Sequence, residues 1–84
     1  NMTNSILYAD LIFNYGTTLK EMGSVDIALS CYYKAKSLYE DLGFVEDSNY
    51  FIFLGNIGGL LGADKKWEAA AESFQTAIDL AKKT

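Results

Sequence analysis

Residues 12–35 read IFNYGTTLKEMGSVDIALSCYYKA, and residues 54–77, which start 42 positions later, read LGNIGGLLGADKKWEAAAESFQTA. Self-similarity at one fixed period is the sequence signature of a repeat architecture. We therefore expect the 84-residue chain to contain two copies of one structural unit. The shift aligns small, aromatic and leucine residues of the two stretches: Gly16 with Gly58, Leu19 with Leu61, Ala28 with Ala70, and Tyr32 with Phe74.

Apolar residues recur at intervals of three and four throughout the chain, as they do in amphipathic helices. Alternation at a period of two, which is typical of strands, is never sustained. The pattern predicts helices at about residues 6–22, 25–41, 48–61 and 66–83. Because the connections between them are short, consecutive helices are expected to be antiparallel neighbours. The predicted fold is all-α and consists of two helix hairpins.

Glycines and capping residues mark the ends of these helices. Gly23 tolerates the left-handed conformation that often follows a helix, and Ser24 is suited to cap the next one. The polar residues 46–49 offer caps for the third helix. Further breaks are expected at residues 43–47 and 62–65.

The alignment also predicts how each hairpin packs. The glycine of each first helix lets the partner helix approach closely, and the aromatic of each second helix fills the space between them. The expected hairpins are residues 1–42 and 43–84, together one small domain. Because an array usually needs about three repeats to bury its faces, we expect the two units to belong to a longer parent or to stack on another copy of the chain.

The composition excludes several classes of function. With one cysteine, Cys31, and no histidine, an internal disulfide, the usual zinc sites and Ser/His or Cys/His nucleophile pairs are excluded. The net charge is -4 and all 7 basic residues are lysines, so nucleic acid is not an expected partner. The most apolar stretch, residues 50–63, is shorter than the roughly 20 residues that cross a bilayer. We expect a cytoplasmic, non-enzymatic protein with no cofactor, metal or membrane partner.

The aligned residues resemble the tetratricopeptide repeat, a helix pair with apolar, leucine, small and aromatic positions in its first helix and alanine, aromatic and alanine in its second. The period of 42 exceeds the family's usual length of about 34, so the chain resembles the longer variety of the repeat. The proline that commonly ends the second helix is Glu40 in one copy and Lys82 in the other. The resemblance implies a right-handed α-solenoid. The matching residues are Ile12, Tyr15, Gly16, Leu19, Ala28, Tyr32 and Ala35, then Leu54, Ile57, Gly58, Leu61, Ala70, Phe74 and Ala77.

Members of this family present the first helix of each hairpin to a concave groove that holds a peptide or protein segment. Asn14 and Asn56 lie two residues before the small residue of their repeat, where several members use a ladder of asparagines to hold a partner backbone. An amide side chain both donates and accepts hydrogen bonds, so it can pair with a peptide unit of the partner whatever the partner's side chains are. The alternative is that both asparagines are simply solvated. The groove residues implied are Asp10, Phe13, Asn14, Thr17, Lys20 and Glu21, then Ile52, Gly55, Asn56, Gly59 and Gly62.

Two other interpretations of these residues are not favoured. The chaperone-tail type of the family clamps a carboxylate with positive side chains, but Phe13 and Gly55 stand where the first of these is needed. The glycine-rich stretch GNIGGLLG, residues 55–62, lacks the motifs of phosphate-binding loops. Its glycines are expected to form a stripe for close helix contact, and the alternative is a weakened third helix.

The sequence leaves two functions open. The first is a non-catalytic module that binds a peptide or protein segment in the concave face of the solenoid. The second is a structural module that stacks head to tail through uncapped repeat ends and forms a homo-oligomer. No set of residues supports an enzyme.

Overall fold

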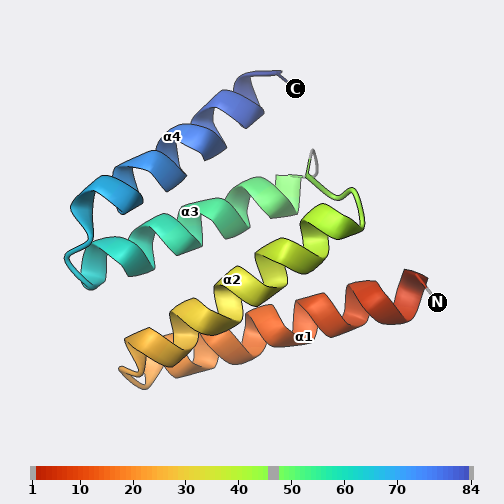
Figure 1. Cartoon of the computed structure of the whole chain (residues 1–84), viewed down its shortest axis with the longest axis horizontal. Coiled ribbons are helices and arrows are strands. Elements are labelled where there is room, and N and C mark those ends of the chain that lie inside the picture. Colours follow the sequence, from red (N-terminus) through yellow and green to blue (C-terminus); the bar gives the residue numbers. More distant parts are fainter. Residues whose placement is uncertain (1, 46–47, 84) are drawn as a thin grey trace. The chain divides into compact units, whose positions relative to one another are not determined.

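The computed structural model describes residues 2–45 and 48–83, with side chains from residues 5–45 and 50–83. In these residues the chain forms four helices and no strand: α1 (Met2–Glu21), α2 (Val25–Asp41), α3 (Ser48–Ala63) and α4 (Trp67–Lys83). The chain divides into two compact units, Asn1–Phe44 and Val45–Thr84. In each unit two helices lie side by side and run in opposite directions (Figure 1). The predicted all-α fold of two hairpins is confirmed.

The first hairpin is held together by a close contact between Gly16 of α1 and Tyr32 of α2. A Cβ atom at Gly16 would lie 2.9 Å from two carbons of the Tyr32 ring and 3.0 Å from the Cβ of Cys31. The Tyr32 side chain is fully buried, as the alignment of small and aromatic residues predicts. The other buried apolar residues of this unit are Ala9, Leu19, Ala28, Leu29 and Ala35.

The second hairpin repeats this contact 42 residues later. A Cβ atom at Gly58 would lie 3.0 Å from three carbons of the Phe74 ring. Phe74 is nevertheless 44% exposed, whereas its equivalent Tyr32 is 0% exposed. The same contact therefore forms in both hairpins, but the aromatic ring is buried only in the first. The buried apolar residues of the second unit are Tyr50, Phe53, Leu54, Ile57, Leu60, Leu61 and Ala70.

The turn of the first hairpin ends α1 with a Schellman motif. The Ser24 N–H donates to the Leu19 carbonyl at 2.9 Å, and Gly23 adopts a φ of 87°, which suits glycine. Ser24 stands at the N-cap of α2, but its side chain makes no capping hydrogen bond. The capping prediction is wrong because a ψ of 70° takes Ser24 out of the extended conformation in which a hydroxyl reaches the first helical N–H groups.

The turn of the second hairpin has the same hydrogen bonds without the glycine. The Lys66 N–H donates to the Leu61 carbonyl at 2.9 Å, and Lys65 takes the left-handed conformation with a φ of 62°. The predicted break at residues 62–65 begins two residues too early, since α3 extends to Ala63. The helix ends where the motif places its left-handed residue, although that residue is a lysine. The predicted caps of the third helix, residues 46–49, lie outside the residues whose side chains are described.

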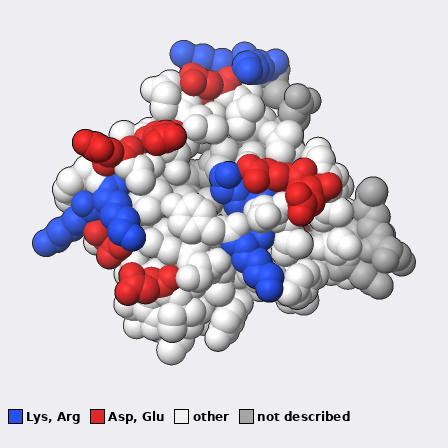
Figure 2. Space-filling view, viewed as in Figure 1, with Lys and Arg blue, Asp and Glu red and all other residues white. Residues whose placement is uncertain are grey.

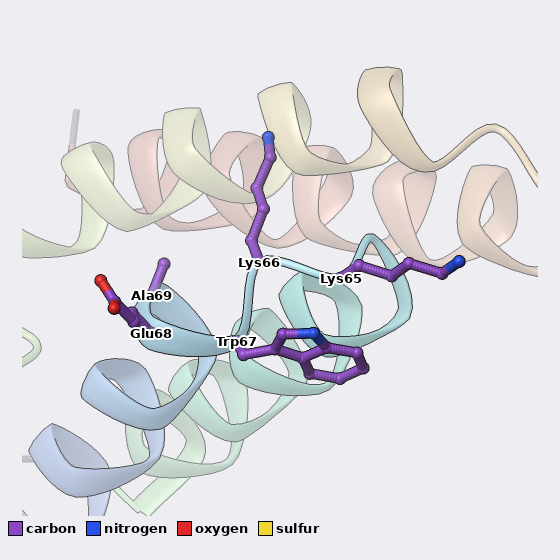
Figure 3. A pocket seen from close by; sticks show the side chains of 5 residues that line it. All are labelled: Lys65, Lys66, Trp67, Glu68 and Ala69. Carbon is purple, nitrogen blue, oxygen red and sulfur yellow. The ribbon is translucent and has the colours of Figure 1, made fainter.

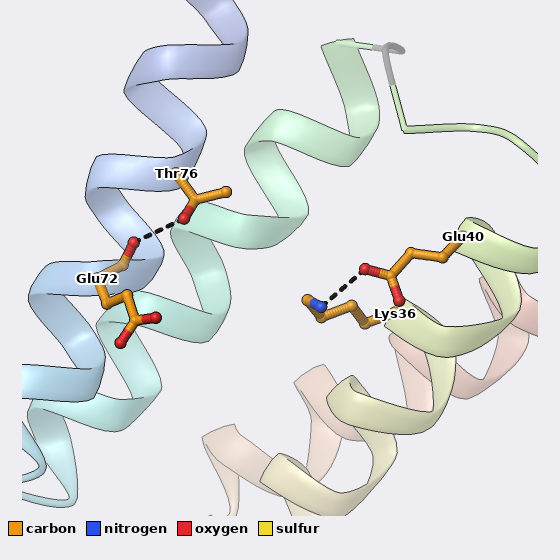
Figure 4. Close-up of polar contacts among 4 residues, drawn as sticks. All are labelled: Lys36, Glu40, Glu72 and Thr76. Carbon is orange, nitrogen blue, oxygen red and sulfur yellow. Dashed lines mark hydrogen bonds and ion pairs between the residues drawn. The ribbon is translucent and has the colours of Figure 1, made fainter.

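Local pairs stabilise the solvent-facing sides of the second helices (Figure 4). On α2 the Lys36 ammonium lies 2.8 Å from the Glu40 carboxylate, one helical turn away. On α4 the Thr76 hydroxyl donates to the Glu72 carbonyl at 2.9 Å. An exposed pair such as the first contributes about 0.3–0.5 kcal/mol. These contacts lie along single helices and stabilise them locally.

Candidate functional site

Three of the predicted groove residues of the first hairpin contact the partner helix of that hairpin. Asp10 accepts a hydrogen bond from the Tyr39 hydroxyl of α2. The Phe13 ring packs edge-on against Tyr32, with ring centroids 5.3 Å apart. The Thr17 hydroxyl lies 2.9 Å from the Tyr32 hydroxyl. These contacts give Asp10, Phe13 and Thr17 a structural role inside the hairpin, and their role in binding stays a prediction.

The direction of the hydrogen bond between the two hydroxyls follows from a count of protons. The Thr17 hydroxyl donates its single proton to the Phe13 carbonyl at 3.1 Å. Tyr32 must therefore be the donor to the Thr17 oxygen, at 2.9 Å. The Tyr32 side chain is thus fixed by the Phe13 ring, by a hydrogen bond to Thr17 and by the close approach to Gly16.

The other predicted residues of α1 are more open to solvent. Asn14 and Glu21 are exposed and Lys20 is half-buried. The Asn14 carbonyl accepts a hydrogen bond from the Thr18 hydroxyl at 3.2 Å, so this contact uses the Asn14 backbone. The Asn14 amide therefore lies where a partner backbone can reach it. Asn56, its equivalent in α3, is half-buried.

The predicted residues of α3 leave open space on the second hairpin. Ile52 and Gly59 are exposed, and Gly55 and Gly62 are partly exposed. Among the described residues, no atom of a neighbouring element lies within 4 Å of where a Cβ would stand at Gly55 or Gly59. The expected stripe of close helix contact is thus wrong at these two positions. Within the glycine-rich stretch, close contact occurs at Gly58, while Gly62 meets the Trp67 ring only at 3.8 Å.

The 42-residue equivalence explains why Phe74 is uncovered. In the first hairpin Phe13 and Thr17 contact Tyr32, and the shift places Gly55 and Gly59 at these positions in the second. The two glycines have no side chain to lay over the Phe74 ring. Phe74 was not among the predicted site residues, but the replacement of Phe13 and Thr17 by glycines in the aligned sequence is the signal that indicates its exposure.

A shallow hollow of about 470 Å³ lies at the start of α4. Residues 65–69 line it, and Figure 3 shows that the Lys66 side chain extends away from those of Lys65 and Trp67, while Glu68 lies on the opposite side. Trp67 lies against Gly62, where an added Cβ would be 3.8 Å from its ring. Catalysis requires functional groups that converge on one reacting atom. The hollow has no such convergence and offers no support for a catalytic site.

Charged side chains are dispersed on the face of the molecule that Figure 2 shows. Figure 2 shows small groups of Lys and of Asp or Glu side chains scattered over the visible face. Within the described part of the chain, no group of three or more His, Cys, Asp or Glu residues is arranged to hold a metal ion. The polar chemistry available at the predicted groove residues is therefore that of amides, hydroxyls and single charges, which suits non-covalent recognition.

Comparison with models of protein families, with curated proteins and with solved structures finds no match to this chain. The resemblance to the tetratricopeptide repeat therefore stays a prediction from the residue pattern. Over residues 2–45 and 48–83, no helix combines the length and the apolar character needed to cross a membrane.

Proposed function

We propose that the chain is a non-catalytic interaction module of the tetratricopeptide-repeat type, which binds a peptide or protein segment on α1 and α3 in the concave face of a right-handed solenoid. One observation carries the proposal: the two hairpins share the glycine–aromatic contact, at Gly16 with Tyr32 and at Gly58 with Phe74. They also share the hydrogen bonds of their turns at positions 42 residues apart. Units that repeat both packing and turn geometry are suited to stack into a solenoid.

The surface chemistry of the first helices supports recognition of a peptide backbone. Asn14 and Asn56 occupy the same position of the repeat, and neither side chain is buried. Their amides offer a donor and an acceptor to a peptide unit. The α3 surface at Gly55 and Gly59 presents helix backbone without side chains, so a bound segment can approach closely there.

A cytoplasmic location belongs to the same proposal. The only cysteine, Cys31, is a half-buried free thiol. A single thiol cannot form a disulfide within the chain, which is the bond that an oxidising compartment would favour.

The experiment is selection from a displayed library of random peptides, followed by fluorescence anisotropy with a selected peptide. We expect Asn14→Ala combined with Asn56→Ala to weaken binding by about tenfold or more, since two hydrogen bonds of about 1 kcal/mol each are lost. The matched control is Gln75→Ala, which removes an amide that is bonded to Asp79 on the exposed side of α4. Equal affinities for the wild-type chain and the double variant would contradict the asparagine ladder. Failure to enrich any peptide would contradict the binding function.

A further inference from the structure

The first helix carries an exposed apolar stripe. Leu7, Leu11 and Tyr15 of α1 are exposed, and Met22 after its end is exposed too. Their spacing of four, four and seven residues places them on one side of the helix. We call these four residues the α1 stripe.

The last helix carries a second stripe of the same kind. Trp67, Phe74 and Ile78 of α4 are exposed. Their spacing of seven and four residues again places them on one side of the helix. We call these three residues the α4 stripe. Neighbouring exposed side chains of this size mark interaction sites more often than isolated ones do.

Three of the stripe residues have buried equivalents in the other two helices. Leu11 is 66% exposed, whereas Phe53, which is 42 residues later in α3, is 0% exposed. Tyr15 is exposed and its equivalent Ile57 is buried. On the α4 side, Phe74 is exposed and its equivalent Tyr32 is buried. At each of these three positions of the repeat, the apolar side chain is buried in one copy and exposed to solvent in the other.

We propose that the α4 stripe of one chain docks on the α1 stripe of a second copy of the chain, with the two helices antiparallel. The part of the α1 stripe from Leu11 to Met22 matches the α4 stripe in length: Leu11 and Met22 are 11 residues apart, and so are Trp67 and Ile78. At about 1.5 Å per residue, each pair spans about 16 Å of helix axis. In the antiparallel arrangement Met22 lies against Trp67 and Leu11 against Ile78.

The helix dipoles favour this orientation over the parallel one. The exposed Glu21 adjoins Met22 at the end of α1, and the exposed Lys65 and Lys66 precede Trp67 at the start of α4. Antiparallel docking brings the carboxylate to the two ammonium groups, and it brings the negative end of the α1 dipole to the positive end of the α4 dipole. Parallel docking would also bring Glu21 close to lysines, Lys82 and Lys83, so the side-chain charges suit both orientations. It would, however, place like ends of the two helix dipoles together, which is unfavourable.

The two stripes are different surfaces, so the contact is heterologous and does not close after two chains. It leaves one free α1 stripe and one free α4 stripe on every assembly. The chain is therefore expected to form linear oligomers that grow with concentration. None of Leu11, Met22, Trp67 and Ile78 belongs to the predicted peptide-binding residues, so this inference stands apart from the proposed function.

Sedimentation equilibrium of the 84-residue chain tests the proposal. For the wild type, the weight-average mass should rise from that of the 9.3 kDa monomer beyond twice this value as the concentration increases toward about 1 mM. Leu11→Glu and Ile78→Glu should each remain monomeric over the same range. Because both side chains are exposed, circular dichroism should show unchanged helix content. Thr76→Glu, about 200° around α4 from Ile78, is the control and should associate like the wild type.

Mixing the two variants gives the decisive result. The Leu11→Glu chain keeps its α4 stripe and the Ile78→Glu chain keeps its α1 stripe, so together they should form a 1:1 dimer that grows no further. A wild type that stays monomeric throughout would overturn the proposal. Dimers that Leu11→Glu disrupts and Ile78→Glu does not, or the reverse, would also overturn it, because they would show that one stripe pairs with itself.

Discussion

The ring of Tyr32 lies against Gly16 so closely that a Cβ atom at Gly16 would be 2.9 Å from two of its carbons. Phe74 lies against Gly58 in the same way, with the corresponding distance at 3.0 Å. The difference between the two pairs is the freedom of the ring. Tyr32 is buried and hydrogen-bonded to Thr17, whereas Phe74 is partly exposed to solvent.

This difference predicts effects of different size for the same substitution, glycine to alanine, in the two hairpins. Gly16→Ala should lower the free energy of unfolding by about 1–2 kcal/mol, because the fixed Tyr32 ring cannot make room for the methyl group. Gly58→Ala should change it by less than about 0.5 kcal/mol. There the Phe74 ring can move outward, and the higher helix propensity of alanine offsets the remaining strain. Urea unfolding followed by circular dichroism measures both values, and equal losses would contradict the account of Phe74.

The left-handed residues of the two hairpin turns, Gly23 and Lys65, predict how substitutions there change the free energy of unfolding. Lys65→Gly should raise the free energy of unfolding by about 0.5–1 kcal/mol, since a φ of 62° strains a residue with a Cβ. Gly23→Ala should lower it by about 1 kcal/mol for the same reason, because Gly23 has a φ of 87°. Thermal unfolding of both variants checks the prediction. A destabilising Lys65→Gly would show that the lysine side chain stabilises the turn more than its backbone strains it.

The open glycines of α3 predict a gain in stability. Gly55→Ala and Gly59→Ala should each raise the free energy of unfolding by about 0.5–1 kcal/mol, because the helix gains propensity and the added methyl meets no neighbouring element. Chemical denaturation of the single and double variants measures the effect. A loss of stability in either variant would mean that these positions are packed.

The partly buried hydroxyl pair of Thr17 and Tyr32 predicts a loss of stability in the first hairpin. Tyr32→Phe removes the donor to Thr17 and should lower the free energy of unfolding by about 1 kcal/mol. Tyr33→Phe on the exposed side of α2 is the matched control and should change it by less than about 0.5 kcal/mol. Similar values for the two variants would argue against the hydrogen bond.

The sequence predicted the elements well because apolar periodicity is strong in this chain. The predicted helix at residues 25–41 agrees with α2, Val25–Asp41. The end of α3 was harder to predict, since glycine at Gly62 is a common stop signal while lysine seldom takes the left-handed conformation that Lys65 has. The alignment held the necessary information, because a shift of 42 places Gly23 on Lys65.

The candidate site was harder to predict than the fold. The family resemblance assigns Phe13 and Thr17 to a groove, but it does not show that both contact Tyr32 within the hairpin. Such contacts depend on side-chain rotamers, which the periodicity of a sequence does not encode. The same limit applies to the exposed Phe74, which has no side chains from Gly55 and Gly59 beside it.

The central claim is that α1 and α3 bind a peptide segment. Its most direct test is to titrate a library-selected peptide into the ¹⁵N-labelled chain and follow the backbone amide resonances. Gly55 and Gly59 are useful reporters because they lie at the open face of α3. We predict saturable shifts concentrated in residues 10–21 and 52–62. Shifts concentrated in α2 and α4 would contradict the claim.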